Sequence, residues 1–252
     1  MALLEVKGLT KRFGGLVAVN RLDFVLNEGE ILGMIGPNGA GKTTVFNLIT
    51  GIYPPDEGDI RLNGQSLLGL RPHVIAERGI GRTFQTIRLF PNLTALENVM
   101  AGQHCRTKAG VLGAIFRPKS QRLEEERIIR KAEECLRFMG IYEMRYELAK
   151  NLPYGHQRRL EIARALATDP RILILDEPAA GLNEQESSEL MALIQQIRDS
   201  GITVLLIEHD MKVVMGISDR IIVLDNGEKI AEGTPKEVQG NPRVIEAYLG
   251  RE

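Results

Sequence analysis

One glycine-rich segment near the start of the chain has the residue types and spacing to bind phosphate. Its nine residues, here called the phosphate loop, are Gly36, Pro37, Asn38, Gly39, Ala40, Gly41, Lys42, Thr43 and Thr44. They match the pattern G-x-x-x-x-G-K-[ST], in which glycines let successive backbone N–H groups curve around a phosphate without a Cβ in the way. In such a loop Lys42 reaches the β- and γ-phosphates, and the hydroxyl of Thr43 binds Mg²⁺. The segment therefore predicts a site for the phosphates of a nucleotide.

The residues on both sides of the phosphate loop fit this interpretation. Residues 30–35 are predicted to form a buried strand, and residues 43–50 a helix that Gly51 ends. The N-terminus of that helix would then face the bound anion. The alternative is a glycine-rich turn without a chemical role, but the order of strand, loop and helix favours the nucleotide site.

A second group of candidate residues lies far downstream, at the end of an aliphatic run. Residues 172–175 predict a buried strand, and Asp176 and Glu177 follow it directly. Such a strand delivers both carboxylates to the edge of an α/β sheet where ligands bind. There Asp176 is suited to hold hydrated Mg²⁺, and Glu177 to polarise an attacking water as a general base. A strand that ends in acids by chance is the alternative, and the phosphate loop in the same chain favours the catalytic interpretation.

The composition of the 252-residue chain is that of a soluble globular protein. Hydrophobic residues make up 43% and charged residues 26%, and the length suits one large α/β domain or two small ones. The net charge of −1 gives no basic field for nucleic acid. The two cysteines, Cys105 and Cys135, lack the spacing of a metal site or of a disulfide framework. With no signal peptide and no apolar run of about 18 residues, the sequence predicts a cytoplasmic protein whose membrane role would require a partner.

The hydrophobic pattern changes along the chain from strands to helices. The first ~85 residues are predicted to be rich in strands, with turn residues such as those at 62–64. The pattern becomes helical over residues 93–166, where residues 94–97 form a capping box and apolar positions at 121–139 follow helical spacing. Residues 106–119 are predicted to form a long loop, either a hairpin packed on the helical region or, as the alternative, a patch that faces a partner or the membrane.

From residue 171 onward strands and helices alternate, which predicts a mainly parallel sheet covered on both faces. The predicted strands are 172–175, 203–207, 220–224 and 229–231, and the predicted helices are 184–199 and 211–217. Residues 225–228 have the composition of a tight hairpin turn. Thr234 and Pro235 then open a short terminal helix. The helical middle of the chain is therefore an insertion into an α/β core.

The motifs follow one another in the order found in the ATP-binding cassette (ABC) ATPases, which this chain resembles over essentially its whole length. The further matches are residues 152–166 (the signature segment), Gln85 after a predicted strand at 79–84 (the Q-loop), residues 181–183 (the D-loop) and His209 (the switch histidine). The resemblance implies an α/β fold: a P-loop NTPase (RecA-like) core with a mainly parallel sheet, an N-terminal antiparallel β portion and an inserted helical subdomain. It implies a single domain over 1–252, with a nucleotide-binding core at 1–88 and 162–235, a helical subdomain at 89–161 and a helical tail at 236–252.

The resemblance also implies a role for each matching residue, with ATP and Mg²⁺ as cofactors. Phe13 matches the aromatic residue that stacks on adenine, with ordinary core packing as the alternative. Gln85 would bind Mg²⁺ or the attacking water, with a structural glutamine as the alternative. His209 would hydrogen-bond the γ-phosphate and help to hold Glu177 and the water in place.

The signature segment departs from the family pattern, because L-P-Y-G-H stands in place of L-S-G-G-Q. Pro153 replaces the serine that contacts the γ-phosphate, and it has neither an N–H nor a side-chain donor. Tyr154 replaces a glycine, but the N-terminus of the following helix can still present N–H groups to an anion. We therefore expect Tyr154, Gly155 and His156 to contact nucleotide with fewer side-chain bonds. Asn183 replaces the D-loop aspartate and would bond across an interface without carrying a charge.

In this family the signature segment of one subunit faces the phosphate loop of another, so two subunits would close head-to-tail over two MgATP. More narrowly, the chain resembles the ATPase subunits of branched-chain amino acid importers, and the matching segments are 12–15, 154–161, 177–183 and 208–211. The implied partners are a second ATPase subunit, integral membrane permeases and, indirectly, a solute-binding protein. The implied location is the inner face of the cell membrane. The alternatives are an ATPase for lipopolysaccharide export and a soluble ATPase of cofactor assembly.

Overall fold

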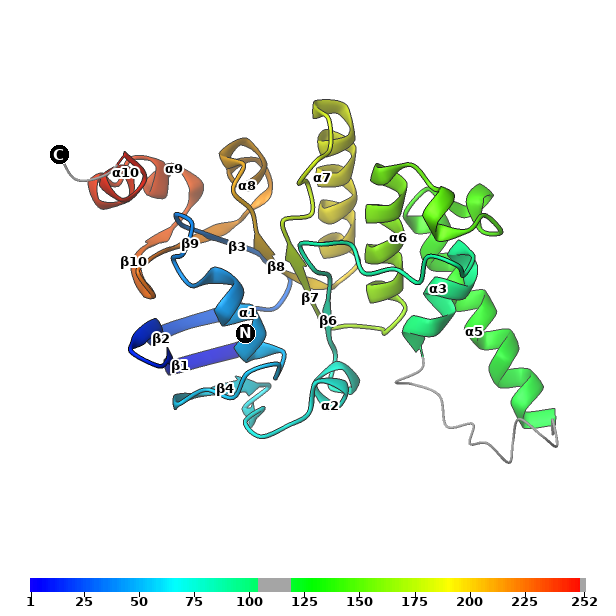
Figure 1. Ribbon diagram of the computed structural model, residues 1–252, viewed down its shortest axis with the longest axis horizontal. Coiled ribbons are helices and arrows are strands. Elements are labelled where there is room, and N and C mark those ends of the chain that lie inside the picture. Colours follow the sequence, from blue (N-terminus) through cyan, green and yellow to red (C-terminus); the bar gives the residue numbers. More distant parts are fainter. Residues whose placement is uncertain (104–118, 250–252) are drawn as a thin grey trace.

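The computed structural model describes residues 1–103 and 119–249, which form two sheets with helices around them (Figure 1). The first sheet is antiparallel and has the strand order β2-β1-β4-β5. Its strands are β1 (Ala2–Phe13), β2 (Leu16–Asn27), β4 (Glu57–Leu62) and β5 (Gln65–Ser66). Asn63 (φ 50°) and Gly64 (φ 74°) form the turn between β4 and β5 in the left-handed conformation that tight hairpins require. The expected N-terminal antiparallel portion is confirmed.

The second sheet has the strand order β10-β9-β3-β8-β7-β6. Its strands are β3 (Ile31–Ile35), β6 (Ile80–Arg82), β7 (Ile172–Asp176), β8 (Thr203–Ile207), β9 (Arg220–Asp225) and β10 (Glu228–Gly233). Neighbouring strands are parallel except β9 and β10, which form the predicted hairpin. Strands β3, β7 and β8 are buried along their whole length, as expected where both faces of a sheet are covered. The prediction of a mainly parallel sheet is confirmed.

Nine α-helices lie within the described ranges 1–103 and 119–249. They are α1 (Lys42–Ile49), α2 (Pro72–Glu77), α3 (Ala95–Gly102), α5 (Lys119–Phe138), α6 (Tyr154–Leu166), α7 (Glu184–Asp199), α8 (Met211–Ile217), α9 (Pro235–Gln239) and α10 (Pro242–Leu249). Helices α3, α5 and α6 pack together at one end of the molecule, which is the inserted helical part of the expected fold (Figure 1). The bounds given for that subdomain, the core and the tail stay predictions. In the part of the chain that the structure describes, no helix is both long enough and apolar enough to cross a membrane.

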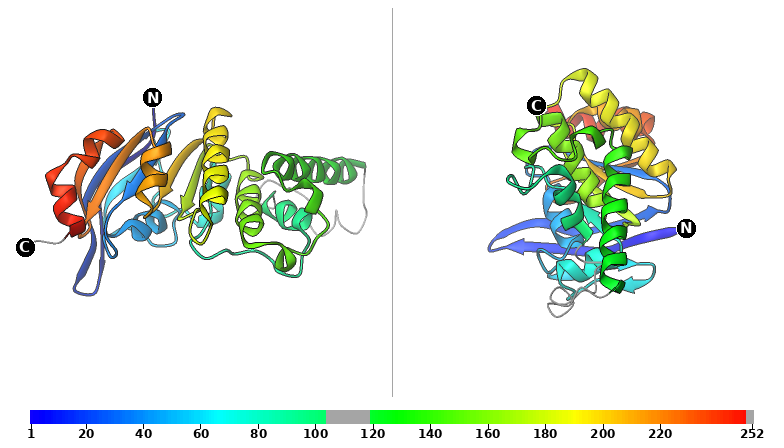
Figure 2. Two further views of the ribbon diagram at one scale, coloured as in Figure 1. Left: turned by 90° about the horizontal axis from the view of Figure 1, so that it is seen from above. Right: turned by 90° about the vertical axis from the view of Figure 1, so that its right-hand side faces the viewer.

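Successive residues of the central strands face two different cores, because side chains alternate across a sheet. Leu32 and Ile174 belong to the core shared with α1 and the antiparallel sheet. Ile31 and Leu173 belong to the core shared with α3, α5, α6 and α7. The right-hand view of Figure 2 shows this layering, with the blue antiparallel strands on one side of the orange strands and the yellow helix α7 on the other. The parallel sheet is therefore the central layer of the molecule.

Several predicted bounds agree with the structure. Helix α7, strand β8 and helix α8 have the predicted ranges. The capping box at Thr94 begins α3, and a second one at Thr234 begins α9. These bounds could be predicted because a cap or the end of an aliphatic run determines each of them locally.

Other predicted bounds are corrected by the structure. The strand predicted before Gln85 is shorter than expected, because β6 lies at the edge of the sheet and only Ile80–Arg82 pair with β7. Helix α1 begins at Lys42, one residue before its predicted start. The tail forms two helices, since Pro242 begins a second one after Asn241. The predicted loop at 106–119 and Cys105 lie outside the described residues, except for position 119 at the start of α5.

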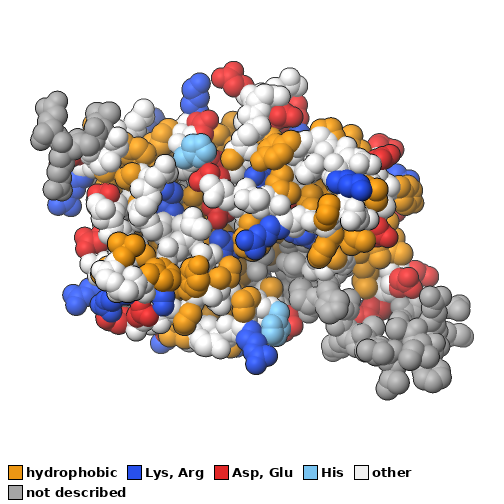
Figure 3. Space-filling view, in the orientation of Figure 1, with side chains coloured by type: hydrophobic (Ala, Val, Ile, Leu, Met, Phe, Trp, Pro, Cys, Tyr) orange, Lys and Arg blue, Asp and Glu red, His pale blue; other side chains and the backbone are white. Residues whose placement is uncertain are grey.

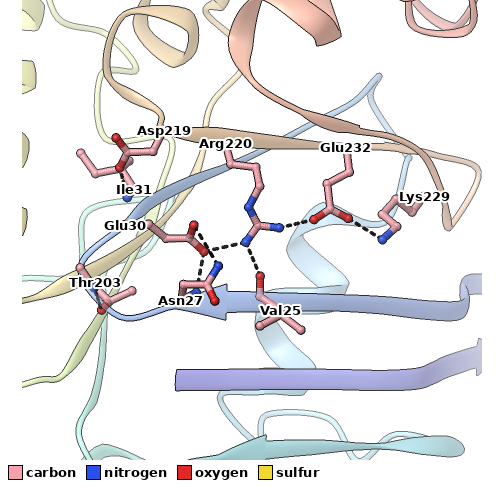
Figure 4. Close-up of polar contacts among 10 residues, drawn as sticks. Val25, Asn27, Glu30, Ile31, Thr203, Asp219, Arg220, Lys229 and Glu232 are labelled. Carbon is pink, nitrogen blue, oxygen red and sulfur yellow. Dashed lines mark hydrogen bonds and ion pairs between the residues drawn. The ribbon is translucent and has the colours of Figure 1, made fainter. Parts of the chain in front are cut away.

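A polar network around Arg220, the first residue of β9, joins the two sheets (Figure 4). Its Nη2 atom donates to the carbonyl oxygen of Val25 in β2 at 2.5 Å and to Oε1 of Glu30 at 2.6 Å. Its Nη1 atom pairs with Glu232 in β10. Oε1 of Glu30 also accepts a hydrogen bond from the N–H of Asn27 at 2.6 Å. The network therefore connects the antiparallel sheet to the edge of the parallel one.

Candidate functional site

The phosphate loop connects β3 to α1, as predicted. Two of its glycines are required by close contacts. A Cβ on Gly36 would lie 2.1 Å from the carbonyl oxygen of Leu224, and a Cβ on Gly41 would lie 2.4 Å from that of Ala18. Gly41 has a φ of 98°, and no side chain caps the N-terminus of α1. The first N–H groups of α1 are therefore free to bind an anion.

Lys42 is buried and turns back onto its own loop. Its Nζ atom donates hydrogen bonds to the carbonyl oxygens of Gly36 at 2.6 Å and Pro37 at 3.0 Å. Burial lowers the pKa of Lys42, while the carboxylates of Glu177 and Asp176 act in the opposite direction. The ammonium group therefore lies within the loop and within the field of two acids.

Asp176 ends β7 and is buried with a cationic partner. Nη2 of Arg82, in β6, lies 3.3 Å from Oδ2 of Asp176. Nη1 of Arg82 also donates to Oδ1 of Asn47 at 2.8 Å and to Oγ1 of Thr50 at 2.9 Å. Burial raises the pKa of Asp176, and the charge of Arg82 opposes that shift. Arg82 belongs to no sequence motif, and its only local signal is a charged residue inside a predicted strand.

Glu177 follows β7 in a strained conformation and receives two contacts on one oxygen. Its φ of 46° lies in the left-handed region that residues with a Cβ rarely adopt, and such strain is often found at functional sites. Nε2 of Gln85 donates to Oε2 of Glu177 at 2.9 Å, and Nδ1 of His209 lies 3.4 Å from the same atom. The three residues predicted as catalytic, from three separate segments, therefore meet.

A hollow of about 550 Å³ lies over the phosphate loop. Its wall includes residues 38–44, Gln85 and Glu177, together with Phe13 at the end of β1. Figure 3 shows hydrophobic side chains over the end of β1 and the start of β2. Phe13 is 42% exposed there, and its ring packs edge-on against Tyr53 with the centroids 5.3 Å apart. Phe13 is therefore not a core residue, and the apolar wall that it forms beside the phosphate loop suits a nucleotide base.

The predicted metal-binding residues lie on three separate segments. Thr43 and Gln85 line the hollow, whereas Asp176 is buried against Arg82. Among residues 1–103 and 119–249, no group of three or more His, Cys, Asp or Glu side chains could hold a metal ion by itself. Because Mg²⁺ bound to a nucleotide takes phosphate oxygens and waters as further ligands, this donor set fits Mg²⁺ only together with the nucleotide.

Tyr154, Gly155 and His156 form the first turn of α6 and do not line the hollow over the phosphate loop. In Figure 1, α6 lies on the far side of β6 and β7 from α1. Pro153 is the N-cap residue of α6, and its side chain makes no hydrogen bond to the helix. The N–H groups of the first turn of α6 are therefore free to bind an anion. The signature segment and the phosphate loop are therefore two separate surfaces of one molecule.

Asn183 has a structural role that the D-loop comparison did not predict. Its Oδ1 atom accepts a hydrogen bond from the N–H of Glu186 at 2.9 Å, and the Glu186 carboxylate accepts one from the N–H of Asn183 at 3.1 Å. This capping box begins α7. The side-chain oxygen that was expected to bond across an interface is thus engaged within its own chain.

Comparison with known proteins gives matches over nearly the whole chain. A family model described as "ABC transporter" matches residues 19–180, and one described as "Branched-chain amino acid ATP-binding cassette transporter" matches residues 228–252. The chain is 51% identical over 249 residues to the high-affinity branched-chain amino acid transport ATP-binding proteins BraF of Pseudomonas aeruginosa and LivG of Escherichia coli, with 98% of each chain covered. It is 34% identical over 252 residues to the lipopolysaccharide export system ATP-binding protein LptB of Escherichia coli, with 100% of this chain and 99% of LptB covered.

Two solved structures are similar to the whole fold. One is the ADP conformation of an ATP-binding cassette of an ABC transporter, with a TM-score of 0.87, 33% identity and full coverage of both chains. The other is a dimeric bacterial ABC transporter cassette, with a TM-score of 0.78, 29% identity and coverage of 92% of this chain and 98% of that one. The similarity therefore includes structures described with nucleotide and as dimers.

Proposed function

The chain belongs to the ABC transporter family, and we propose that it is the ATP-hydrolysing subunit of a membrane importer for branched-chain or related amino acids. The high identity to two branched-chain amino acid transport ATP-binding proteins and the family match at residues 228–252 support this substrate class. Lipopolysaccharide export is supported less well, because the relative of that system is only 34% identical.

The observation that carries the proposal is the meeting of Gln85 and His209 on Glu177 beside the phosphate loop. A carboxylate in this place can accept a proton from the water that attacks the γ-phosphate, which is general-base catalysis. Gln85 would orient the water, and His209 would donate to the γ-phosphate while it keeps Glu177 in place. The strained backbone of Glu177 fixes the direction in which its side chain leaves the strand.

The phosphates of ATP would replace the internal bonds of the phosphate loop. Lys42 would exchange the carbonyl oxygens of Gly36 and Pro37 for the β- and γ-phosphates. Thr43 and Gln85 would hold Mg²⁺, which when bound neutralises charge on the transferred phosphoryl group. Because Oδ2 of Asp176 is engaged by Arg82, Asp176 would act on the metal through water.

A complete catalytic site would require two subunits. The first turn of α6 has free N–H groups for an anion, but it lies away from the phosphate loop of its own chain. Head-to-tail pairing would bring each signature segment to the nucleotide of the other subunit, and the dimeric cassette among the similar structures supports such a pair. ATP would drive closure because it contacts both halves only in the closed state.

An apolar hollow of about 370 Å³ beside the Gln85 segment suits a permease. Its wall includes Ile52, Ile75, Phe84 and Phe90, and Phe90 is 51% exposed. We infer that a cytoplasmic segment of the permease docks here, which would hold the protein at the inner face of the membrane. Since Phe84 directly precedes Gln85, a segment in this hollow would be adjacent to the catalytic residues.

The variant Glu177→Gln tests the proposed function. We expect ATP hydrolysis to fall by about 100-fold or more, while ATP still binds and produces a dimer on gel filtration.

Cells that lack the protein should lose high-affinity uptake of radiolabelled leucine, and the wild type but not Glu177→Gln should restore it. Glu125→Gln, an exposed acid on α5, is the matched control and should behave as wild type. Undiminished hydrolysis by Glu177→Gln would remove Glu177 as the base, and normal leucine uptake without the protein would contradict the substrate class.

A further inference from the structure

Arg158, near the start of α6, joins the signature segment to the segment that carries Gln85. Its side chain is 0% exposed. Nη1 donates to the carbonyl oxygen of Phe84 at 2.9 Å and to Oε2 of Glu161 at 3.0 Å. Nη2 donates to the carbonyl oxygen of Gln85 at 3.0 Å. The guanidinium group therefore fixes the backbone of the residue whose side chain contacts Glu177.

Tyr154 joins the same arginine to the turn that follows Glu177. Its hydroxyl accepts a hydrogen bond from Nη2 of Arg158 at 3.3 Å and donates one to the carbonyl oxygen of Ala180 at 3.1 Å. The aromatic ring packs on Gly181, where an added Cβ would lie 3.0 Å from the Cε1 atom of the ring. The N–H of Ala180 in turn donates to the carbonyl oxygen of Glu177 at 3.2 Å.

Together these bonds form a closed chain of contacts through the catalytic residues. From Glu177 it runs through Ala180 to Tyr154, on to Arg158 and to the backbone of Gln85. It returns to Glu177 through Nε2 of Gln85 at 2.9 Å. The glycine that the family pattern has at position 154 offers neither the hydroxyl nor the aromatic ring, so the contact to Ala180 depends on Tyr154, a residue in which the chain departs from the pattern.

We propose that Tyr154 and Arg158 are positioning residues that hold Gln85 against Glu177 and transmit movement of α6 to this catalytic pair. The proposal rests on the proposed function, in which the first turn of α6 faces the nucleotide of a second subunit. When that turn moves on closure, the two side chains move Gln85 and the Glu177 turn of the same chain with it. The signature segment, which would contact the nucleotide of the other subunit, is thereby coupled to Gln85 and Glu177, which would act on the nucleotide of their own subunit.

Tyr154 is the better residue to replace, because Arg158 also stabilises a buried acid. The Glu161 side chain is 1% exposed, and burial raises its pKa. Removal of Arg158 would take away the guanidinium group that lies 3.0 Å from Oε2 of this carboxylate, and the loss of one member of a buried ion pair destabilises a fold whatever the function of the pair. Tyr154→Phe removes a single hydroxyl, and it keeps both the aromatic ring on Gly181 and the Arg158–Glu161 pair.

Steady-state ATP hydrolysis by the full chain with Tyr154→Phe tests the proposal. We expect kcat to fall about threefold to tenfold, as the loss of one positioning hydrogen bond implies. KM for ATP and Tm should be unchanged, because Tyr154→Phe keeps the backbone N–H groups that would face the nucleotide, and the lost hydroxyl bonds to Ala180 and Arg158 within the chain. Tyr146→Phe is the matched control. Tyr146 is 68% exposed, its ring contacts Arg145, and it is not part of this chain of contacts. Its kcat should equal that of the wild type.

A double-mutant cycle with Gln85→Ala then shows whether Tyr154 acts through Gln85. If it does, Tyr154→Phe lowers kcat much less in the Gln85→Ala background than in the wild type. Additive losses, an unchanged kcat, a raised KM at constant kcat, or a lower Tm that accounts for the lost activity would each overturn the proposal. A wild-type protein that neither binds nor hydrolyses ATP would instead contradict the proposed function, so the two failures are distinguishable.

Discussion

At the scale of single residues, Asp176 at the end of β7 is buried and yet has to carry a negative charge to act on Mg²⁺. Its side chain is 3% exposed, and a buried carboxyl group without a partner would take up a proton. Arg82, which is 6% exposed, supplies the compensating charge and is itself held by Asn47 and Thr50. The acid proposed to act on Mg²⁺ is therefore held in place by the fold before any nucleotide binds.

Arg82→Met should destabilise the fold in a pH-dependent way. Removal of one partner of a buried ion pair costs about 3–5 kcal/mol, which urea unfolding at neutral pH would measure. Burial already raises the pKa of Asp176 above its unfolded value, and loss of Arg82 raises it further. The folded state then binds the proton more tightly than the unfolded state does. The loss relative to the wild type should therefore be smallest near pH 4 (roughly the unfolded pKa), and it should grow as the pH rises from the folded pKa of the wild type to the higher folded pKa of the variant.

The matched control for this prediction is Arg171→Met. Arg171 pairs with Glu28 at the surface, where the side chains are 48% and 56% exposed. An exposed pair contributes about 0–1 kcal/mol, so this variant should lose little stability at any pH. Equal losses in the two variants, or a loss in Arg82→Met that is the same at every pH, would contradict the account of Asp176.

At the scale of elements, the sequence predicts what is decided locally. Helix α7 has its predicted bounds because Asn183 and Glu186 cap it, and β8 because its five aliphatic or β-branched residues are all buried. Arg220 and Glu30 lie 190 positions apart, so no local pattern contains their pairing. The hairpin turn predicts the strand β10, which begins at Glu228 and not at the predicted residue 229, but the contact of its neighbour β9 with β2 could not be predicted.

The candidate site follows the same rule. Gln85, Glu177 and His209 could be named in advance because each lies in a recognisable motif, and the fold then brings them together. The positioning role of Arg158 could not be predicted, since two of its acceptors are backbone oxygens 73 and 74 positions earlier in the chain. Tyr154 was visible only as a departure from the signature pattern, without its partner at Ala180.

Arg220→Met tests the connection between the two sheets. The side chains of Arg220 and Glu30 are 22% and 14% exposed, so the loss of these charge-assisted bonds should lower the free energy of unfolding by about 2–3 kcal/mol. Because the network lies outside the hollow over the phosphate loop, kcat for ATP should change less than about twofold, a small difference on the free-energy scale. Arg61→Met, another strand arginine but 50% exposed, is the control for stability. A similar loss in both variants would show that the network does not join the sheets energetically.

At the scale of the whole molecule, three surfaces meet at Phe84 and Gln85. They are the hollow over the phosphate loop, the signature segment at the start of α6 and the apolar hollow proposed to bind a permease. Phe84 lines the hollow, Gln85 contacts Glu177, and the backbone of both is held by Arg158. A change at any one of the three surfaces therefore has a direct structural path to Glu177. This arrangement suits a motor subunit, in which ATP binding by a pair of cassettes has to move a membrane partner.

Phe90→Asp should weaken binding of the permease at the apolar hollow without lowering ATP hydrolysis by the isolated subunit. A charge on the exposed wall of an apolar docking surface has to be desolvated on binding, so co-purification of the permeases from detergent-solubilised membranes should fall by about tenfold or more. The bonds of Phe90 to Asn98 are made by its backbone, so the local fold and ATP hydrolysis by the isolated subunit should persist. Tyr146→Asp, a charge at another exposed aromatic, controls for surface charge alone. Permease recovery that is normal with Phe90→Asp, or reduced equally by both variants, would place the docking surface elsewhere.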